Sequence, residues 1–241
     1  MLGCTNNKSS EFSLNRNLIV GMSLDYPPFE AKQNEQAYGF DVDLAQYIAN
    51  KMGKKLIIRE ISFNNITEAL KNSDIDMAIS AISQDSIQDP AIKFSNCYIT
   101  EGLALLSSTK TKKYAQNFED FSKKGKIISI ENTSIHRFIE QYQKRHNVKL
   151  DTLYFPNIYA ALTYMEQNGD SGAILVDNHV ALDIIRKQNY KFFMQTLHSF
   201  GYDNYAIAMP QNSPMLEEVN EILLELLADG VIDNLRAKWL R

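Results

Sequence analysis

The order of strand-forming and helix-forming segments in residues 18–83 is the strongest constraint on the fold. An apolar strand at Leu18–Val20 leads into a polar loop. A helix follows whose apolar residues recur every four positions from Phe40 to Met52, with Gly53 closing it. A strand, a helix and a strand are then predicted at Leu56–Ile58, Ile66–Leu70 and Met77–Ile79. The resulting order, β-α-β-α-β, predicts a parallel sheet with helices on both faces.

The same order of elements returns from residue 126 onward. An apolar strand at Ile127–Ile130 precedes a helix from Ser134 to His146, for which Ser134 is the predicted N-cap. A strand, a helix and a strand follow at Leu150–Phe155, Ala161–Met165 and Ala173–Val176. Two β-α-β-α-β units in one chain predict an α/β protein of two similar lobes with mainly parallel sheets.

Two further apolar strands, at Leu103–Lys113 and Tyr205–Met209, follow the two units and are expected to cross between the lobes. The amphipathic helix that begins at Leu216 is expected to complete the first lobe. The predicted division of the chain is a first lobe of residues 18–107 plus 206–241 and a second lobe of residues 108–205. A ligand cleft is expected between the lobes, at the carboxyl ends of the strands.

Composition excludes several classes of function. The formal net charge of −4 is the opposite of the basic surface that nucleic-acid binding needs. No apolar run of about 18 residues is present that could span a membrane as a helix. The four histidines lack the spacing of metal ligands, and the sequence contains no Walker loop or dinucleotide-binding glycine motif. No metal or cofactor is therefore expected.

Small polar and acidic residues follow the strands at the expected cleft. The first lobe contributes Asp25 and Tyr26 after its first strand, and the small-residue segment Ser80–Ser83 after its third. The second lobe contributes Glu131–Ser134 and Asp177. Hydroxyl groups, aromatic rings and carboxylates together suit a small, polar, nitrogen-bearing ligand.

Five motifs occur in order along the chain from Leu18 onward. They are Asp25-Tyr-Pro-Pro-Phe-Glu, Gly39-Phe-Asp-Val-Asp-Leu-Ala, Asp76-Met-Ala-Ile-Ser-Ala-Ile-Ser, Phe94-Ser-Asn-Cys-Tyr, and Ala228-Asp-Gly through Lys238-Trp-Leu. Together they resemble the bacterial amino-acid-binding proteins of ABC transporters, the extracellular solute-binding proteins of family 3. The resemblance implies the type II periplasmic binding fold and a monomer without catalytic activity that closes its lobes on a ligand. It also implies a protein of the periplasm or cell envelope that delivers this ligand to an ABC permease in the inner membrane.

The resemblance further implies roles for individual cleft residues. In the first lobe, Asp25 would bind the ligand, and Tyr26 and Phe63 would stack on it. The hydroxyl or backbone N–H groups of Ser80, Ala81 and Ser83 would contact an α-carboxylate. The second lobe would contribute Thr133, Ser134 and Asp177. Asp177 would accept hydrogen bonds from the α-ammonium group, because a desolvated ammonium needs a charged partner. The alternative for Asp177 is a solvated carboxylate that caps the following helix.

One position departs from the family pattern. The family usually has an arginine five residues after the hydroxyl that matches Ser83, where it grips the α-carboxylate, whereas this chain has Gln88. Either another cation substitutes or the ligand is not an ordinary α-amino acid. The candidate cations are Lys93, His136 and Arg137, each of which could equally be a surface residue. Glu131 and Asp25 add carboxylates near the cleft, which favours a ligand with more positive than negative charge unless both side chains face solvent.

The N-terminal residues predict a membrane anchor. Met1-Leu-Gly-Cys4 followed by a polar run to Asn17 resembles the end of a bacterial lipoprotein signal. Cys4 would then carry the lipid, residues 1–17 would be signal remnant and flexible tether, and the membrane would be contacted only through this anchor. The alternative is an incidental cysteine. Cys97, beside apolar residues, is expected to be a buried small side chain rather than a disulfide partner of Cys4.

Two other functions remain open from the sequence. A sensory or orphan binding module would use the same cleft, and a neighbouring permease gene would separate it from a transport receptor. A dehydratase-like enzyme on this scaffold would need a buried acid of raised pKa in the cleft, for which Glu131 and Asp177 are the candidates.

Overall fold

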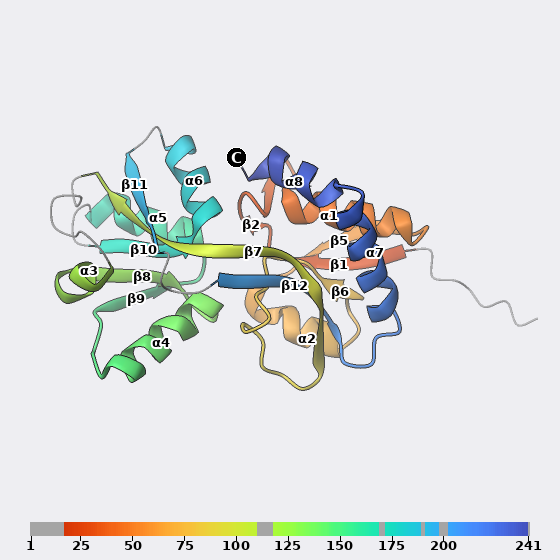
Figure 1. Ribbon diagram of the computed structural model, residues 1–241, viewed down its shortest axis with the longest axis horizontal. Coiled ribbons are helices and arrows are strands. Elements are labelled where there is room, and N and C mark those ends of the chain that lie inside the picture. The colour runs from red at the N-terminus through yellow and green to blue at the C-terminus, as the bar shows by residue number, and fades with distance from the viewer. Residues whose placement is uncertain (1–16, 110–117, 169–171, 189–190, 198–201, 241) are drawn as a thin grey trace, which may run out of the picture.

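The computed structural model describes residues 17–109, 118–168, 172–188, 191–197 and 202–240. Two α/β lobes lie side by side along the longest axis of the molecule (Figure 1). Two strands, β7 (Ile92–Ser108) and β12 (Tyr202–Pro210), run between them. The predicted architecture of two similar lobes joined by two crossing strands is confirmed.

The first lobe is built on three parallel strands covered by helices. Its elements are β1 (Asn17–Met22), β5 (Lys55–Glu60), β6 (Met77–Ala78), α1 (Phe40–Lys51) and α2 (Ile66–Lys71). β1 is the middle strand, with Leu18 opposite Leu56 and Val20 opposite Met77. The helices α1 and α2 contribute to separate apolar clusters on the two faces of this sheet, as the sequence predicts. Gly53 follows α1 with a φ of 65°, the left-handed conformation common just after a helix end.

The segment predicted as a polar loop after β1 contains a small antiparallel sheet. Its strands are β2 (Asp25–Tyr26), β3 (Glu30–Gln33) and β4 (Gln36–Tyr38), which are too short to show an alternating pattern in the sequence. Gly39 lets the chain pass close behind this sheet into α1. Its φ is 134°, and a Cβ atom there would lie 2.2 Å from the carbonyl oxygen of Phe29. A short 3-10 helix, η1 (Phe63–Asn65), precedes α2.

The second lobe repeats the arrangement of the first. Its predicted elements are β8 (Lys126–Ile130), α4 (Ser134–His146), β9 (Thr152–Phe155), α5 (Ile158–Asn168) and β10 (Gly172–Asp177), with β8 pairing in parallel with β9 and β10. Successive residues of β10 point to opposite faces: Leu175 packs in the cluster that contains Ile139 of α4, and Val176 in the cluster that contains Ile158 of α5. Elements not predicted are α3 (Phe118–Lys124) and β11 (Phe192–Thr196), and α6 (Asn178–Lys187) is the helix that follows Asp177.

Strand β7 is hydrogen-bonded to strands of both lobes. Up to Gly102 it pairs with β12, and beyond that point it pairs with β10 and β11, with Leu103 opposite Asp177. The strands of both lobes therefore form one hydrogen-bonded path through β7. We propose that the division between the lobes lies near Gly102 and Tyr202, rather than at residues 107 and 205, because β7 changes its partners there.

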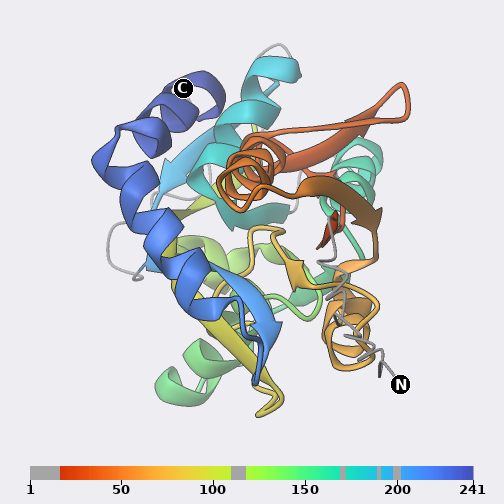
Figure 2. The ribbon, with the colours of Figure 1, turned by 90° about the vertical axis from the view of Figure 1, so that its right-hand side faces the viewer.

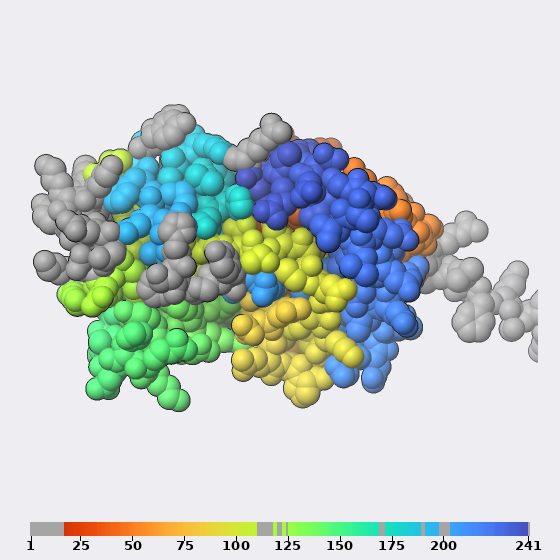
Figure 3. Space-filling view, in the orientation of Figure 1, coloured from red at the N-terminus to blue at the C-terminus, as the bar shows by residue number. Residues whose placement is uncertain are grey.

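Two C-terminal helices cover one side of the first lobe (Figures 2 and 3). They are α7 (Leu216–Ala228) and α8 (Val231–Trp239). Trp239 is partly buried against the core, and its indole Nε1 donates a hydrogen bond of 2.8 Å to Asp43 of α1, which fits the expected closing role of this tail. Within the described ranges, no helix combines the length and the apolar character needed to cross a membrane.

Cys97 is exposed, which corrects the prediction that its side chain is buried. The pairing of β7 with β12 shifts register next to Ala206, the partner of Cys97, so the alternation of buried and exposed residues is interrupted there. The Cys97 thiol donates a hydrogen bond of 2.9 Å to the carbonyl of Ile99. Cys4 and residues 1–16 of the predicted tether lie outside the described residues, so lipidation stays a prediction, and Asn17 belongs to β1.

Candidate functional site

A cavity of about 190 Å³ lies between the two lobes. Both lobes and strand β12 contribute to its wall. The predicted site residues that line it are Asp25, Tyr26, Phe63, Ser80, Ala81, Ser83, Thr133, Ser134 and Asp177. Gln88 is placed differently, because it is exposed and lines an adjoining hollow of about 480 Å³ that also includes Phe63, His136 and Arg137.

Asp177 ends strand β10 and is only 2% exposed. Its Oδ2 accepts a hydrogen bond of 2.5 Å from the Tyr26 hydroxyl in the opposite lobe, while its buried Oδ1 has no hydrogen-bond partner among the described residues. Burial, followed by the nearby carboxyls of Asp203 and Glu101, raises the pKa of Asp177 from 3.8 to about 8, and the hydroxyls of Tyr205 and Tyr26 partly offset this rise. The side chain makes no capping hydrogen bond to α6, which argues against the alternative of a helix cap. A buried carboxyl with a free acceptor atom on a cavity wall can bind a hydrogen-bonding cation.

Two buried acids lie at the first-lobe wall of the cavity, and one of them, Glu30, lines it. Glu30 and Asp41 are both fully buried. Burial raises the pKa of Asp41 to about 6, and burial together with the charge of Asp41 raises the pKa of Glu30 well above its usual range. Two adjacent carboxylates in a desolvated site oppose each other's ionisation, which accounts for the raised pKa of Glu30. Asp41 also accepts a hydrogen bond of 2.9 Å from the Tyr98 hydroxyl.

The donors at the end of β6 are already hydrogen-bonded to these acids. The Ser80 hydroxyl donates to Glu30 at 2.7 Å, and the Ala81 backbone N–H donates to Asp41 at 2.6 Å. Ser80 Oγ also accepts a hydrogen bond of 3.0 Å from the backbone N–H of Ser23. Ser80 and Ala81 therefore lie on the cavity wall as predicted, but both donors are used within the protein.

Asp203 on β12 connects the two lobes. Its Oδ1 accepts a hydrogen bond of 3.1 Å from the Ser83 hydroxyl of the first lobe, and its Oδ2 accepts one of 2.6 Å from the Ser134 hydroxyl of the second. Burial raises the pKa of Asp203, and these two hydrogen bonds partly offset the effect. Asp203 and the cavity-lining Tyr205 were not among the predicted site residues. Their spacing in the sequence could have identified them. Residues two positions apart on a strand lie on the same face, and this strand crosses between the lobes.

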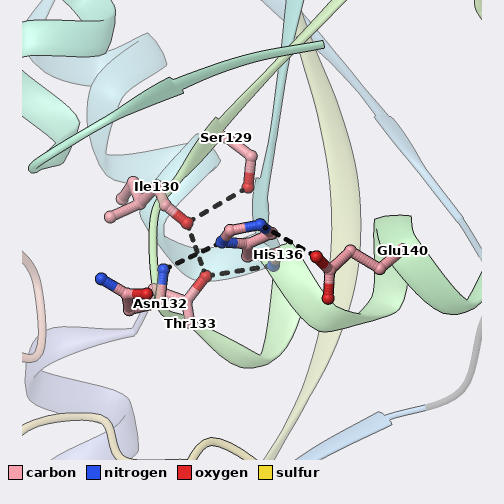
Figure 4. Close-up of polar contacts among 6 residues, drawn as sticks. All are labelled: Ser129, Ile130, Asn132, Thr133, His136 and Glu140. Atoms are coloured by element: carbon pink, nitrogen blue, oxygen red, sulfur yellow. Dashed lines mark hydrogen bonds and ion pairs between the residues drawn. The ribbon is translucent and has the colours of Figure 1, made fainter.

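Thr133, rather than the predicted Ser134, caps helix α4 (Figure 4). Its hydroxyl accepts a hydrogen bond of 3.2 Å from the backbone N–H of His136 and donates one of 2.9 Å to the carbonyl of Ile130. Nδ1 of His136 accepts a hydrogen bond of 3.0 Å from the backbone N–H of Asn132. Asn132 has a φ of 60°, which confirms that it takes the left-handed conformation usually supplied by glycine. These contacts fix the second-lobe loop at the cavity.

None of the three candidate cations lines the cavity. Lys93 is exposed on β7, and Nε2 of His136 lies 3.6 Å from a carboxylate oxygen of Glu140. Arg137 donates through both terminal guanidinium nitrogens to the backbone carbonyls of residues 85 and 86. The charged residue types among the described lining residues are all acidic: Asp25, Glu30, Glu131 and Asp177. The cavity therefore favours a positively charged occupant.

Hydrogen bonds across the cleft hold the lobes in contact. Tyr26 reaches Asp177, and Arg137 of α4 reaches the segment that follows β6. Asn132 Nδ2 of the second lobe also donates to Asn64 Oδ1 of the first at 3.1 Å. The structure therefore shows the closed arrangement of the two lobes, which is the arrangement that encloses a small ligand.

Known proteins resemble this chain over nearly its whole length. The model of bacterial extracellular solute-binding proteins, family 3, matches residues 18–241. The arginine-binding extracellular protein ArtP of Bacillus subtilis (strain 168) is 24% identical, with 99% of this chain and 92% of ArtP covered.

Two solved structures share the fold closely. An ancestral arginine-binding protein bound to arginine is 28% identical with a TM-score of 0.80, covering 94% of this chain and 99% of that protein. The ancestral amino acid-binding protein AncCDT-1, a precursor of cyclohexadienyl dehydratase, is 26% identical with a TM-score of 0.80, covering 94% of this chain and 96% of that protein. The match of the family model, the fold and the closed two-lobed cavity agree, and this chain belongs to the bacterial extracellular solute-binding proteins, family 3.

Proposed function

We propose that this protein, a substrate-binding protein of an ABC transporter, holds a small solute with a protonated nitrogen between its lobes and delivers it to a membrane permease. The observation that carries the proposal is the Asp177 carboxyl, which is buried on the cavity wall with one oxygen unpartnered among the described residues. A protonated amine or guanidinium supplies both the hydrogen bond and the charge that this oxygen lacks.

The remaining lining residues fit the same kind of solute. Tyr26 and Phe63 offer aromatic faces, which attract cations as well as apolar side chains. Asp25 and Glu131, from opposite lobes, add negative potential at the cavity. ArtP and the ancestral protein in complex with arginine are both arginine-binding, which supports a solute with a positive charge.

We assign binding rather than catalysis to this site. The family and its curated relatives are binding proteins, although AncCDT-1 is a precursor of an enzyme. The raised pKa of Asp177 would also suit a general acid, but its Oδ2 already accepts a hydrogen bond from Tyr26, which orients the carboxyl as an acceptor. Prolonged incubation with a bound solute, followed by mass spectrometry, should return the solute unchanged, and a product would refute the assignment.

The cellular setting follows from the same proposal. We propose a monomer in the periplasm or cell envelope, anchored through a lipid on Cys4. Mass spectrometry of the protein extracted from the membrane of a producing bacterium should show a diacylglyceryl group on Cys4, and Cys4→Ala should release the protein from that membrane. Membrane attachment of the variant would contradict the anchor.

Thermal unfolding with a panel of solutes is the first test of the proposed function. At about 100 times its dissociation constant, a ligand adds roughly 2.7 kcal/mol to the free energy of unfolding. This gain corresponds to a rise of about 5–10 °C in the midpoint for a chain of this size. Guanidines, amines and cationic amino acids should raise the midpoint, and solutes without a protonated nitrogen should not. A rise only with solutes that lack a protonated nitrogen would refute a cation site.

Binding of a cation should tighten as the pH rises toward 8. The Asp177 carboxyl, whose pKa is raised to about 8, is mainly protonated at pH 6 and must release its proton before it can pair with a cation. Each pH unit below 8 should therefore weaken the affinity by up to about tenfold. Calorimetry with a guanidinium ligand at pH 6–9, in buffers of different ionisation enthalpy, should detect the released proton. A constant affinity without proton release would contradict this role of Asp177.

Arg137→Ala should shorten the lifetime of the closed complex. Arg137 donates from the second lobe to two backbone carbonyls of the first, and hydrogen bonds to a charged group contribute about 1.5–3 kcal/mol. The dissociation rate constant of a bound solute should rise at least about tenfold. The solute leaves when the lobes open, and the loss of these interlobe hydrogen bonds makes that opening faster. Arg145→Ala, an exposed arginine of the same helix, is the matched control and should leave the rate unchanged. Equal rates in both variants would show that Arg137 does not hold the lobes together.

A further inference from the structure

We infer that the solute is an amine or guanidine without the free carboxylate of an amino acid, because acceptors of the protein itself, mostly carboxyls, occupy the donors predicted for such a carboxylate. The inference rests on the proposed cation site and narrows its solute class. It also assigns to Asp203 the role of a specificity-determining residue.

The predicted donors on the cavity wall are already hydrogen-bonded within the protein. The Ser80 hydroxyl donates to Glu30, and the Ala81 backbone N–H donates to Asp41. The hydroxyls of Ser83 and Ser134 both donate to Asp203. The Thr133 hydroxyl donates to the carbonyl of Ile130. A hydroxyl has only one hydrogen to donate. None of these groups can therefore donate to a solute carboxylate without breaking an existing hydrogen bond.

Asp203 makes the exclusion specific. Its carboxyl accepts a hydrogen bond from one hydroxyl of each lobe. It therefore occupies the position where these two hydroxyls could otherwise both donate to an anionic group of the solute. A solute carboxylate brought to Ser83 and Ser134 would meet a second carboxyl within a desolvated site. Like charges in such a site repel strongly, and rejection of the wrong ligand by repulsion is a common source of specificity.

The described lining of the cavity also lacks a compensating cation. Among the described residues that line the cavity there is no lysine, arginine or histidine. Gln88 is exposed in the adjoining hollow, and Arg137, a candidate substitute in the same hollow, is held by the carbonyls of residues 85 and 86. A solute carboxylate would therefore be buried among acids without a partner, whereas the ammonium or guanidinium of an amine would pair with Asp177.

Matched pairs of solutes that differ only in the carboxylate test the inference. Arginine against agmatine and lysine against cadaverine present the same cationic end to the wild-type protein. Calorimetry should give a dissociation constant at least about tenfold lower for the amine of each pair. Equal or tighter binding of the amino acids would overturn the inference and leave the cation site intact, because both members of a pair carry the cation. If neither member binds and solutes without a protonated nitrogen do, the proposed function fails as well.

Asp203→Asn separates the role of this residue from a general preference for amines. Asparagine keeps an acceptor for a serine hydroxyl, removes the negative charge and adds an N–H donor. The preference for agmatine over arginine should fall at least about tenfold. Asp151→Asn, an exposed aspartate of the second lobe, is the matched control and should keep the wild-type ratio. A wild-type ratio in folded Asp203→Asn protein, checked by circular dichroism, would show that Asp203 does not exclude the carboxylate.

Discussion

Asp177→Asn is expected to weaken binding of a cationic solute by about 30-fold to several thousand-fold. The expectation follows from truncation of a buried, hydrogen-bonded charge pair, which typically costs about 2–5 kcal/mol. The amide keeps the approximate shape and the acceptor for the Tyr26 hydroxyl, but it cannot supply the negative charge that the solute requires. Calorimetric titration of the variant with the best ligand of the panel measures the effect, and Asp151→Asn should bind as the wild type does.

The same variant should be at least as stable as the wild type when no ligand is present. A carboxyl with a raised pKa in the folded protein stabilises it at low pH, and this contribution is lost as the pH rises from about 4 to about 8. Above pH 8 the wild type buries an ionised Asp177 and the variant does not. A variant that both loses binding and unfolds at a lower temperature at pH 9 would indicate a structural role for Asp177 instead of a ligand contact.

Asp41→Ala is expected to lower the free energy of unfolding by about 3–5 kcal/mol, because it leaves buried donors without an acceptor. Asp41 accepts hydrogen bonds from the Ala81 backbone N–H and the Tyr98 hydroxyl, both in the interior of the first lobe. The midpoint of thermal unfolding should fall by roughly 10 °C for a chain of this length. Differential scanning calorimetry of the unliganded protein provides the measurement.

An exposed acid in an equivalent position provides the control for this variant. Glu217 lies in the first turn of α7, as Asp41 lies in the first turn of α1, but its side chain is exposed. Glu217→Ala loses only the interaction with the helix dipole, which contributes about 0.3–1 kcal/mol. Similar losses in both variants would mean that the buried hydrogen bonds of Asp41 contribute little.

The repeated β-α-β-α-β order could be predicted because hydrophobic periodicity is a local property of the sequence. The rule that ligands bind at the carboxyl ends of parallel strands then located most lining residues, including Asp177 after β10. Gln88 was assigned by its position in a family motif, and the structure places its side chain in the adjoining hollow. A residue's position in a motif predicts the course of the backbone well, but it predicts the direction of an exposed side chain less well.

The hydrogen-bond partners of the donors on the cavity wall could not be predicted from the sequence. Ser80 and Ala81 occur in a segment that suits ligand contact, but their partners Glu30 and Asp41 lie some 40 to 50 residues away in the chain. Asp203 is more distant still from Ser83 and Ser134. Hydrogen bonds between distant segments are set by tertiary packing, which also decides that Thr133 rather than Ser134 caps α4.

The continuity of β7 limits how the protein can open. This strand has 17 residues and extends over roughly 55 Å, and its two parts belong to the sheets of opposite lobes. Sliding one lobe past the other would break ladder hydrogen bonds along the strand, whereas bending near Gly102 and Tyr202 disturbs few of them. We therefore expect opening to be a rotation about a single axis, which would release a solute from one edge of the protein only. Asp203, one residue from this axis, would stay close to the solute's exit throughout that rotation.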